Sequence, residues 1–240
     1  MYTLIYGSLI ILIPGIIFSL YAQYKVNSTF TRYSKIESSS RFSAENLSSL
    51  LLEQSGCHGV VIGRTHGHLT DHYNPQTNAL NLSDTTYGRT NVAALGVASH
   101  ECGHAVQKHE NSLLLTLRTF LVPLTRYGSI LAVPIAILGV ILELLIGGVG
   151  TNFGTYVLAL GILLYATSTI FALVTLPVEI DASRRAVAML DNTSFFDERE
   201  LKAVKRVLYA AALTYVATLV VSFLYLLRFI ILLNQFRKRD

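Results

Sequence analysis

Charged side chains are scarce in this sequence. Asp, Glu, Lys and Arg make up 14% of its 240 residues, whereas soluble domains carry roughly 25%. A chain with so little polar surface is not expected to be a soluble globular protein. Four apolar stretches account for the missing charge, and each is close in length to the ~20 residues that cross a bilayer as a helix: Leu4–Ala22, Ser129–Ile146, Phe153–Leu176 and Val207–Leu233.

Cysteine is also rare, with only Cys57 and Cys102 in the chain. Two cysteines exclude a disulfide-stabilised scaffold and fit a domain in a reducing compartment. The net charge of +4 is modest, and the basic residues stand beside the apolar stretches. We therefore expect the lipid bilayer as a partner and no nucleic acid.

Basic residues are absent before the first apolar stretch, where a signal peptide would carry them. We therefore expect this stretch to remain as an anchor. Lys and Arg gather after the first and the third stretches, which predicts that the polar regions lie in the cytoplasm. The hairpin tip, Gly147–Asn152, is uncharged. The C-terminal FRKRD would lie outside if Val207–Leu233 crosses the membrane, which conflicts with the charge pattern. This stretch is therefore expected to cross, to be re-entrant or to pack against the hairpin.

These patterns predict a mainly α membrane protein with about four transmembrane helices and a cytoplasmic α+β domain. The polar region has a helical pattern at Ser43–Leu52 and strand patterns at Val60–Ile62, Leu69–Tyr73 and Ala79–Leu82, the last two around an Asn-Pro-Gln-Thr-Asn turn. The expected division is a first transmembrane helix (1–23), a polar region (24–126), a transmembrane hairpin (129–176), a second polar segment (177–206) and a fourth apolar helix (207–233).

The motif His-Glu-x-x-His occupies residues 100–104, inside a helical pattern that runs from Asn91 to His109. Histidines four positions apart on a helix lie on one face and can reach one metal ion. Glu101 stands beside them, within reach of a water at that metal. The pentapeptide alone also occurs by chance on surface helices, so the question is whether a third ligand exists.

Acidic residues that could supply this third ligand are few. A histidine six residues after His104 is missing, because Glu110 occupies that position and Gln107 replaces the expected glycine. Glu179 follows the third apolar stretch, in LPVEIDASRRA. It is therefore expected on the same side of the membrane as the His-Glu-x-x-His motif. We favour Glu179, which the preceding Pro177 places in the first turn of a helix, and keep Glu110 and Asp181 as alternatives.

Several segments together resemble a known family. VASHECGHAVQ and LPVEIDASRRA are similar to the ligand helices of the HtpX and CAAX-type membrane proteases. The YugP-type bacterial membrane zinc metallopeptidases are a closer match, with YSKIESS, GHLTDHYNPQTNALNLS and AALTYVA in the same order. The resemblance implies a gluzincin-like domain, one zinc ion per chain and proteolysis at a membrane. Ser183 departs from the HtpX-like pattern, in which an Asp would orient a ligand histidine.

A zinc peptidase mechanism gives the remaining residues candidate roles. His100, His104 and Glu179 would bind zinc, and Glu101 would act as the general base. Tyr215 is a candidate donor to the oxyanion, as is Arg184 or Arg185. The strand that contains Asn81 and Leu82 could bind an extended substrate if it has a free edge.

The leading hypothesis is a multi-pass zinc endopeptidase of the bacterial cell membrane, active on the cytoplasmic side against membrane or membrane-adjacent proteins. A membrane-protein regulator or complex is a further expected partner. One alternative is a membrane scaffold with a non-catalytic zinc site. Another is a site-2-type intramembrane protease, which requires the motif helix itself to span the bilayer.

Overall fold

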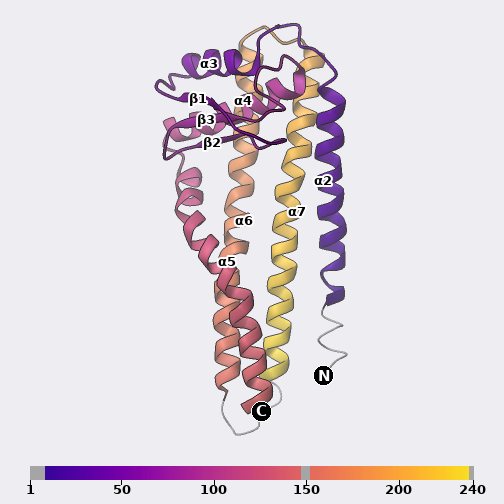
Figure 1. Ribbon diagram of the computed structural model, residues 1–240, viewed down its shortest axis with the longest axis vertical. Helices are drawn as coiled ribbons and strands as arrows, with labels where there is room; N and C mark the ends of the chain where they lie inside the picture. Colours follow the sequence, from indigo (N-terminus) through magenta and orange to yellow (C-terminus); the bar gives the residue numbers. More distant parts are fainter. Residues whose placement is uncertain (1–8, 147–151, 238–240) are drawn as a thin grey trace. The chain divides into compact units, whose positions relative to one another are not determined.

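The computed structural model describes residues 9–146 and 152–237 (Figure 1). The expected hairpin tip falls largely on 147–151, outside the described residues, as does the end of FRKRD. The helices are α2 (Ile13–Tyr33), α3 (Ala44–Gln54), α4 (Val92–His109), α5 (Leu113–Ile146), α6 (Phe153–Asn192) and α7 (Glu198–Arg237), and the strands are β1 (Val61–Arg64), β2 (His72–Asn74) and β3 (Ala79–Leu82).

The chain divides into two compact units. The apolar unit comprises residues 1–21, 117–176 and 215–240, and the site unit comprises residues 22–116 and 177–214. The helices α2, α5, α6 and α7 each contribute residues to both units.

Three helices among the described residues are long and apolar enough to cross a membrane: α5, α6 and α7. Within the apolar unit, α5 and α6 approach closely at Gly139 and Gly161, as small residues allow in membrane helices. The Glu143 carboxylate accepts a hydrogen bond of 2.7 Å from the backbone N–H of Thr155, in the first turn of α6. The expected first span begins in residues outside the described part, so the count of four stays a prediction.

Helix α6 corrects one local prediction. Pro177 was expected to begin a helix and to place Glu179 in its first turn, but α6 continues through Pro177. Proline is tolerated inside a long helix where neighbouring groups satisfy the carbonyl that it leaves unbonded. Glu179 therefore lies in the interior of a helix. Likewise α7 is continuous, with no turn inside Val207–Leu233 of the kind that a re-entrant segment needs.

The site unit contains a three-stranded sheet in the order β1-β3-β2. β1 pairs with β3 in parallel, and β2 pairs with β3 antiparallel around the predicted turn, where the Asn74 side chain accepts from the backbone N–H of Gln76. The strand expected over Leu69–Tyr73 begins only at His72. Leu69 has φ 54°, which is incompatible with an extended strand.

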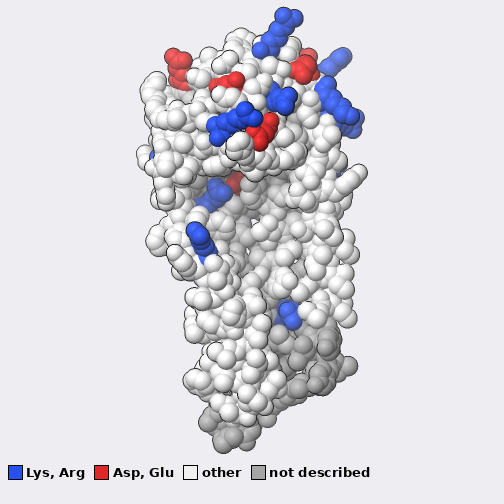
Figure 2. Space-filling model, in the orientation of Figure 1, with Lys and Arg blue, Asp and Glu red and all other residues white. Residues whose placement is uncertain are grey.

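Helix α4 is the central element of the site unit. Asn91 caps its N-terminus, because its side chain accepts a hydrogen bond of 2.9 Å from the N–H of Ala94. Lys108 and His109 stand in the last turn, where basic side chains interact favourably with the helix dipole. In Figure 1, α3, α4 and the sheet lie together, and α4 contacts α3, β2 and β3. Figure 2 shows that charged side chains on this face gather over the region of α3, α4 and the sheet.

Candidate metal centre

Two histidines and one glutamate form a buried cluster in the site unit. His100 and His104 lie one turn apart on α4, with ring centroids 4.8 Å apart. Glu179 on α6 places its Oε2 at 3.1 Å from Nε2 of His100 and 3.4 Å from Nε2 of His104. One ligand atom from each residue lies within 4.8 Å of the others, and no side chain of the three is more than 13% exposed.

The orientation of His104 is fixed by a glutamine on the same helix. Gln107 is 1% exposed, and its amide Nε2 donates to the carbonyl oxygen of Val178 at 2.9 Å and to Oδ2 of Asp181 at 2.7 Å. Its Oε1 consequently faces Nδ1 of His104, at 2.9 Å. Since an amide oxygen only accepts, Nδ1 of His104 carries the proton, and the lone pair of Nε2 faces Glu179.

The other histidine of the cluster has a hydroxyl partner. Oγ of Ser183 lies 3.2 Å from Nδ1 of His100, at the position where the HtpX-like pattern has an Asp. The hydroxyl can accept from Nδ1, and Nε2 of His100 then faces the same carboxylate oxygen of Glu179. The structure thus supplies an orienting group for each ring, although a neutral hydroxyl binds an imidazole less strongly than a carboxylate does.

The two alternative third ligands have different partners. Arg185 donates from Nε to Oδ2 of Asp181 at 2.7 Å and from one NH group to Oε2 of Glu110 at 2.6 Å. Neither acid belongs to the cluster among the described residues. Two imidazole nitrogens and one buried carboxylate form the donor set that catalytic zinc sites use, with a fourth position left open. The residues present therefore fit a zinc ion.

Glu101 lies on α4 next to the first ligand and is buried. Its Oε2 accepts a hydrogen bond of 2.8 Å from the backbone N–H of Tyr73 on β2. Burial raises the pKa of Glu101 to about 7; the positive potential of His100 opposes this shift, and the carboxylates of Glu179 and Asp71 add to it. A carboxyl group that titrates near neutrality can both accept a proton and return it.

A close approach of two helix backbones brings the ligands together. Gly103 lies between the two histidines on α4, and a Cβ atom at this position would stand 2.5 Å from the carbonyl oxygen of Ala182 on α6. Any side chain larger than hydrogen would therefore push α4 away from the helix that carries Glu179. The glycine thus allows the backbone approach that places both histidines next to Glu179.

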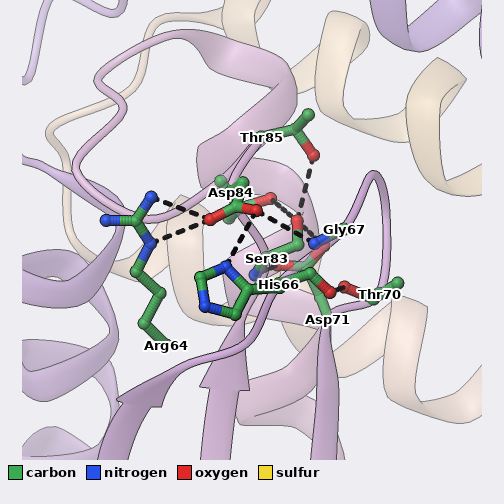
Figure 3. Close-up of polar contacts among 9 residues, drawn as sticks. Arg64, His66, Gly67, Thr70, Asp71, Ser83, Asp84 and Thr85 are labelled. Atoms are coloured by element: carbon green, nitrogen blue, oxygen red, sulfur yellow. Dashed lines mark hydrogen bonds and ion pairs between the residues drawn. The ribbon is translucent and has the colours of Figure 1, made fainter.

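The loop between β1 and β2 is held by Asp84 (Figure 3). Arg64 donates from Nε and one NH2 group to Oδ1 of Asp84, at 2.9 and 2.8 Å, and the N–H of Gly67 donates to Oδ2 at 3.0 Å. The Gly67 and Arg64 hydrogen bonds lower the pKa of Asp84 to about 2. The ring of His66, almost fully exposed, lies 3.5 Å from the same carboxylate.

The remaining predicted site residues do not join the cluster. The prediction that Asn81 and Leu82 lie on a free edge strand is wrong, because β3 is the central strand and pairs on both sides. Leu82 is fully buried in the core, and Asn81 contacts His72 on β2. Arg184 is exposed, and Tyr215 belongs to the apolar unit. Roles for Arg184 and Tyr215 stay predictions.

Sequence reasoning missed three contributors: Gln107, Gly103 and the backbone of Tyr73. The helical pattern already places Gln107 on the face of His100 and His104, at a spacing of three from His104, but it was given no role toward either histidine. That shared face was the available signal. The other two depend on contacts with α6 and β2, which no local pattern reveals.

Comparisons with known proteins agree with this geometry. A family model described as "Putative neutral zinc metallopeptidase" matches residues 8–234. The chain is 38% identical over 214 residues to "Putative membrane protease YugP" of Bacillus subtilis (strain 168), which covers 89% of this chain and 91% of that protein. No solved structure matches the chain.

Proposed function

Because the chain belongs to the family described as "Putative neutral zinc metallopeptidase", we propose that it is a membrane-bound zinc endopeptidase. Its site would cleave peptide bonds in membrane or membrane-adjacent proteins. The observation that carries this proposal is the convergence of His100, His104 and Glu179, with both Nε2 atoms directed at one carboxylate oxygen and Glu101 buried beside them.

His100, His104 and Glu179 would hold one zinc ion per chain. Zinc in such a site supplies a Lewis acid and lowers the pKa of its water towards ~7. The residues of this chain supply the proton transfers. Glu101 accepts a proton from the attacking water at its carboxylate and returns it to the leaving amine. The hydrogen bond from Tyr73 N–H fixes one carboxylate oxygen of Glu101, which leaves the other for this exchange.

The polar site unit is proposed to lie in the cytoplasm, since Lys and Arg follow the apolar stretches on this side. A site-2-type mechanism is not favoured. Helix α4, which carries the motif, is not among the three helices apolar enough to span a membrane in the described part of the chain. A membrane-protein regulator is proposed because an open cytoplasmic protease would damage other proteins.

The test is peptide cleavage by the zinc-loaded full-length chain in detergent, comparing wild type with Glu101→Gln. The variant should keep one zinc and lose about 10²–10⁴-fold in turnover, the usual contribution of a general base. The matched control is Glu53→Gln, an exposed glutamate near the end of α3, which should keep full activity. Zinc binding without cleavage that depends on Glu101 would refute the peptidase and favour a zinc-binding scaffold.

A further inference from the structure

A basic pocket lies in the site unit between α2 and α7. It has a volume of about 560 Å³ and is lined by four cationic side chains, Lys25 and Arg32 from α2 and Lys205 and Arg206 from α7. None of its lining residues is acidic. Among the described residues, none of the four cations forms an ion pair with a carboxylate of the chain. The pocket therefore concentrates positive charge that the chain does not neutralise.

A buried tyrosine holds the two arginines in place. One NH group of Arg206 donates to the hydroxyl of Tyr33 at 2.9 Å, and the guanidinium of Arg32 lies 5.8 Å from the centroid of the Tyr33 ring. Tyr33 is only 7% exposed. Both contacts fix a cation without removing its charge, because the partners are a neutral hydroxyl and an aromatic face. The arginines are thus positioned for an anion.

The ends of the apolar stretches on the two helices place the pocket at the level of the membrane surface. The apolar stretch that enters α2 ends at Ala22, just before Lys25, and the apolar stretch of α7 begins at Val207, just after Arg206. Tyr209 lines the pocket and is 66% exposed. Basic and tyrosine side chains at the end of an apolar helix are typical of the headgroup region of a bilayer.

We propose that this pocket binds the phosphate of an anionic phospholipid. The phosphodiester carries one negative charge, which the guanidinium groups of Arg32 and Arg206 can hydrogen-bond while the ammonium groups of Lys25 and Lys205 approach from either helix. A zwitterionic headgroup would bring its own cation into a pocket that already holds four. The pocket therefore selects phosphatidylglycerol over phosphatidylcholine. This site is separate from the metal centre and independent of peptidase activity.

The test measures lipid retained on the full-length chain by native mass spectrometry, from mixed micelles of phosphatidylglycerol or phosphatidylcholine. The double variant Lys25→Gln/Lys205→Gln removes two exposed charges that have no side-chain partner among the described contacts. It should weaken phosphatidylglycerol binding about 30-fold, since each basic residue near an anionic headgroup contributes roughly fivefold. Arg32→Gln is a second variant and should weaken binding in the same direction.

The matched control is Lys35→Gln/Arg199→Gln, two exposed cations outside the pocket that form no ion pair among the described contacts. It removes the same charge from neighbouring positions outside the pocket and should leave lipid binding unchanged. An equal loss in this control, or equal retention of the two lipids by wild type, would overturn the proposal. A third arm adds sodium phosphate. Displacement of the lipid by free phosphate at equal concentration would assign the pocket to a soluble anion and overturn the lipid assignment.

Discussion

Gly103→Ala adds one methyl group where the backbones of α4 and α6 approach closely in the site unit. The new Cβ atom would stand 2.5 Å from the backbone oxygen of Ala182, whereas an ordinary contact begins at 3.4 Å. The helices must therefore separate by about 0.9 Å, the difference between these distances. The neighbour is backbone, which cannot rotate away as a side chain can.

This separation of the helices should lower zinc affinity more than it lowers the stability of the fold. Overpacking destabilises the fold by about 1–3 kcal/mol, whereas the higher helix propensity of alanine stabilises it by about 1 kcal/mol. The free energy of unfolding should therefore fall by about 0–2 kcal/mol. Metal–ligand distances tolerate only about 0.2 Å of change. A displacement several times larger moves both histidines on α4 away from Glu179, and we expect zinc affinity to fall by at least the ~10–100-fold seen for loss of an orienting group.

The assay is competition for zinc with a chelator of known affinity, together with thermal unfolding of the metal-free protein. Gly96→Ala is the control on the same helix, because its Cβ would meet the side chain of Val204 at 3.2 Å, a contact that a shift of a few tenths of an ångström relieves. It should bind zinc normally and be as stable as wild type or slightly more so. Wild-type zinc affinity in Gly103→Ala would refute the argument that this contact sets the ligand geometry.

Three further predictions concern other parts of the site unit. Glu179→Ala should lose most of the zinc measured per chain by atomic absorption; retention of zinc would exclude Glu179 as a ligand. Gln107→Leu should weaken zinc binding about 10–100-fold in the same chelator competition, because nothing then fixes the tautomer of the ligand histidine, and unchanged affinity would contradict this role. The pKa of Asp84 is lowered in the folded state to about 2, so its contacts stabilise the fold at pH above about 4 and are lost as pH falls towards about 2. Asp84→Asn should flatten this part of the curve of unfolding temperature against pH, and an unaltered curve would show that the carboxylate does not contribute.

The three-residue cluster could be predicted from sequence because helix geometry makes the spacing of its histidines informative. His100 and His104 need only one regular helix to share a face, and Glu179 was one of few acids that return to the same side of the apolar hairpin. The groups that orient the histidines were harder to predict from sequence. Ser183 contacts His100 from α6, and the Gln107 amide is oriented by Val178 and Asp181 of α6; the distance between those helices is not encoded in either one alone.

The errors have identifiable physical causes. The position of β3 between β1 and β2 could not be read from Asn81 and Leu82, because strands of three or four residues carry too little pattern to fix their pairing order. Pro177 was misread because proline is favoured at the first position of a helix and is costly in the interior of a soluble one. A helix stabilised along a long apolar run can instead include it.

The position of Glu179 within α6 has a consequence for biosynthesis. His100 and Glu179 are separated by 79 residues, and this interval includes all of α5 and the apolar part of α6. At about 5–20 residues per second, a ribosome takes roughly 4–16 s to add the last ligand after the first. During that time the chain has its histidines but no complete metal centre. The proposed zinc site can therefore form only after synthesis of the hydrophobic hairpin, and a chain truncated before α6 lacks one residue of the cluster.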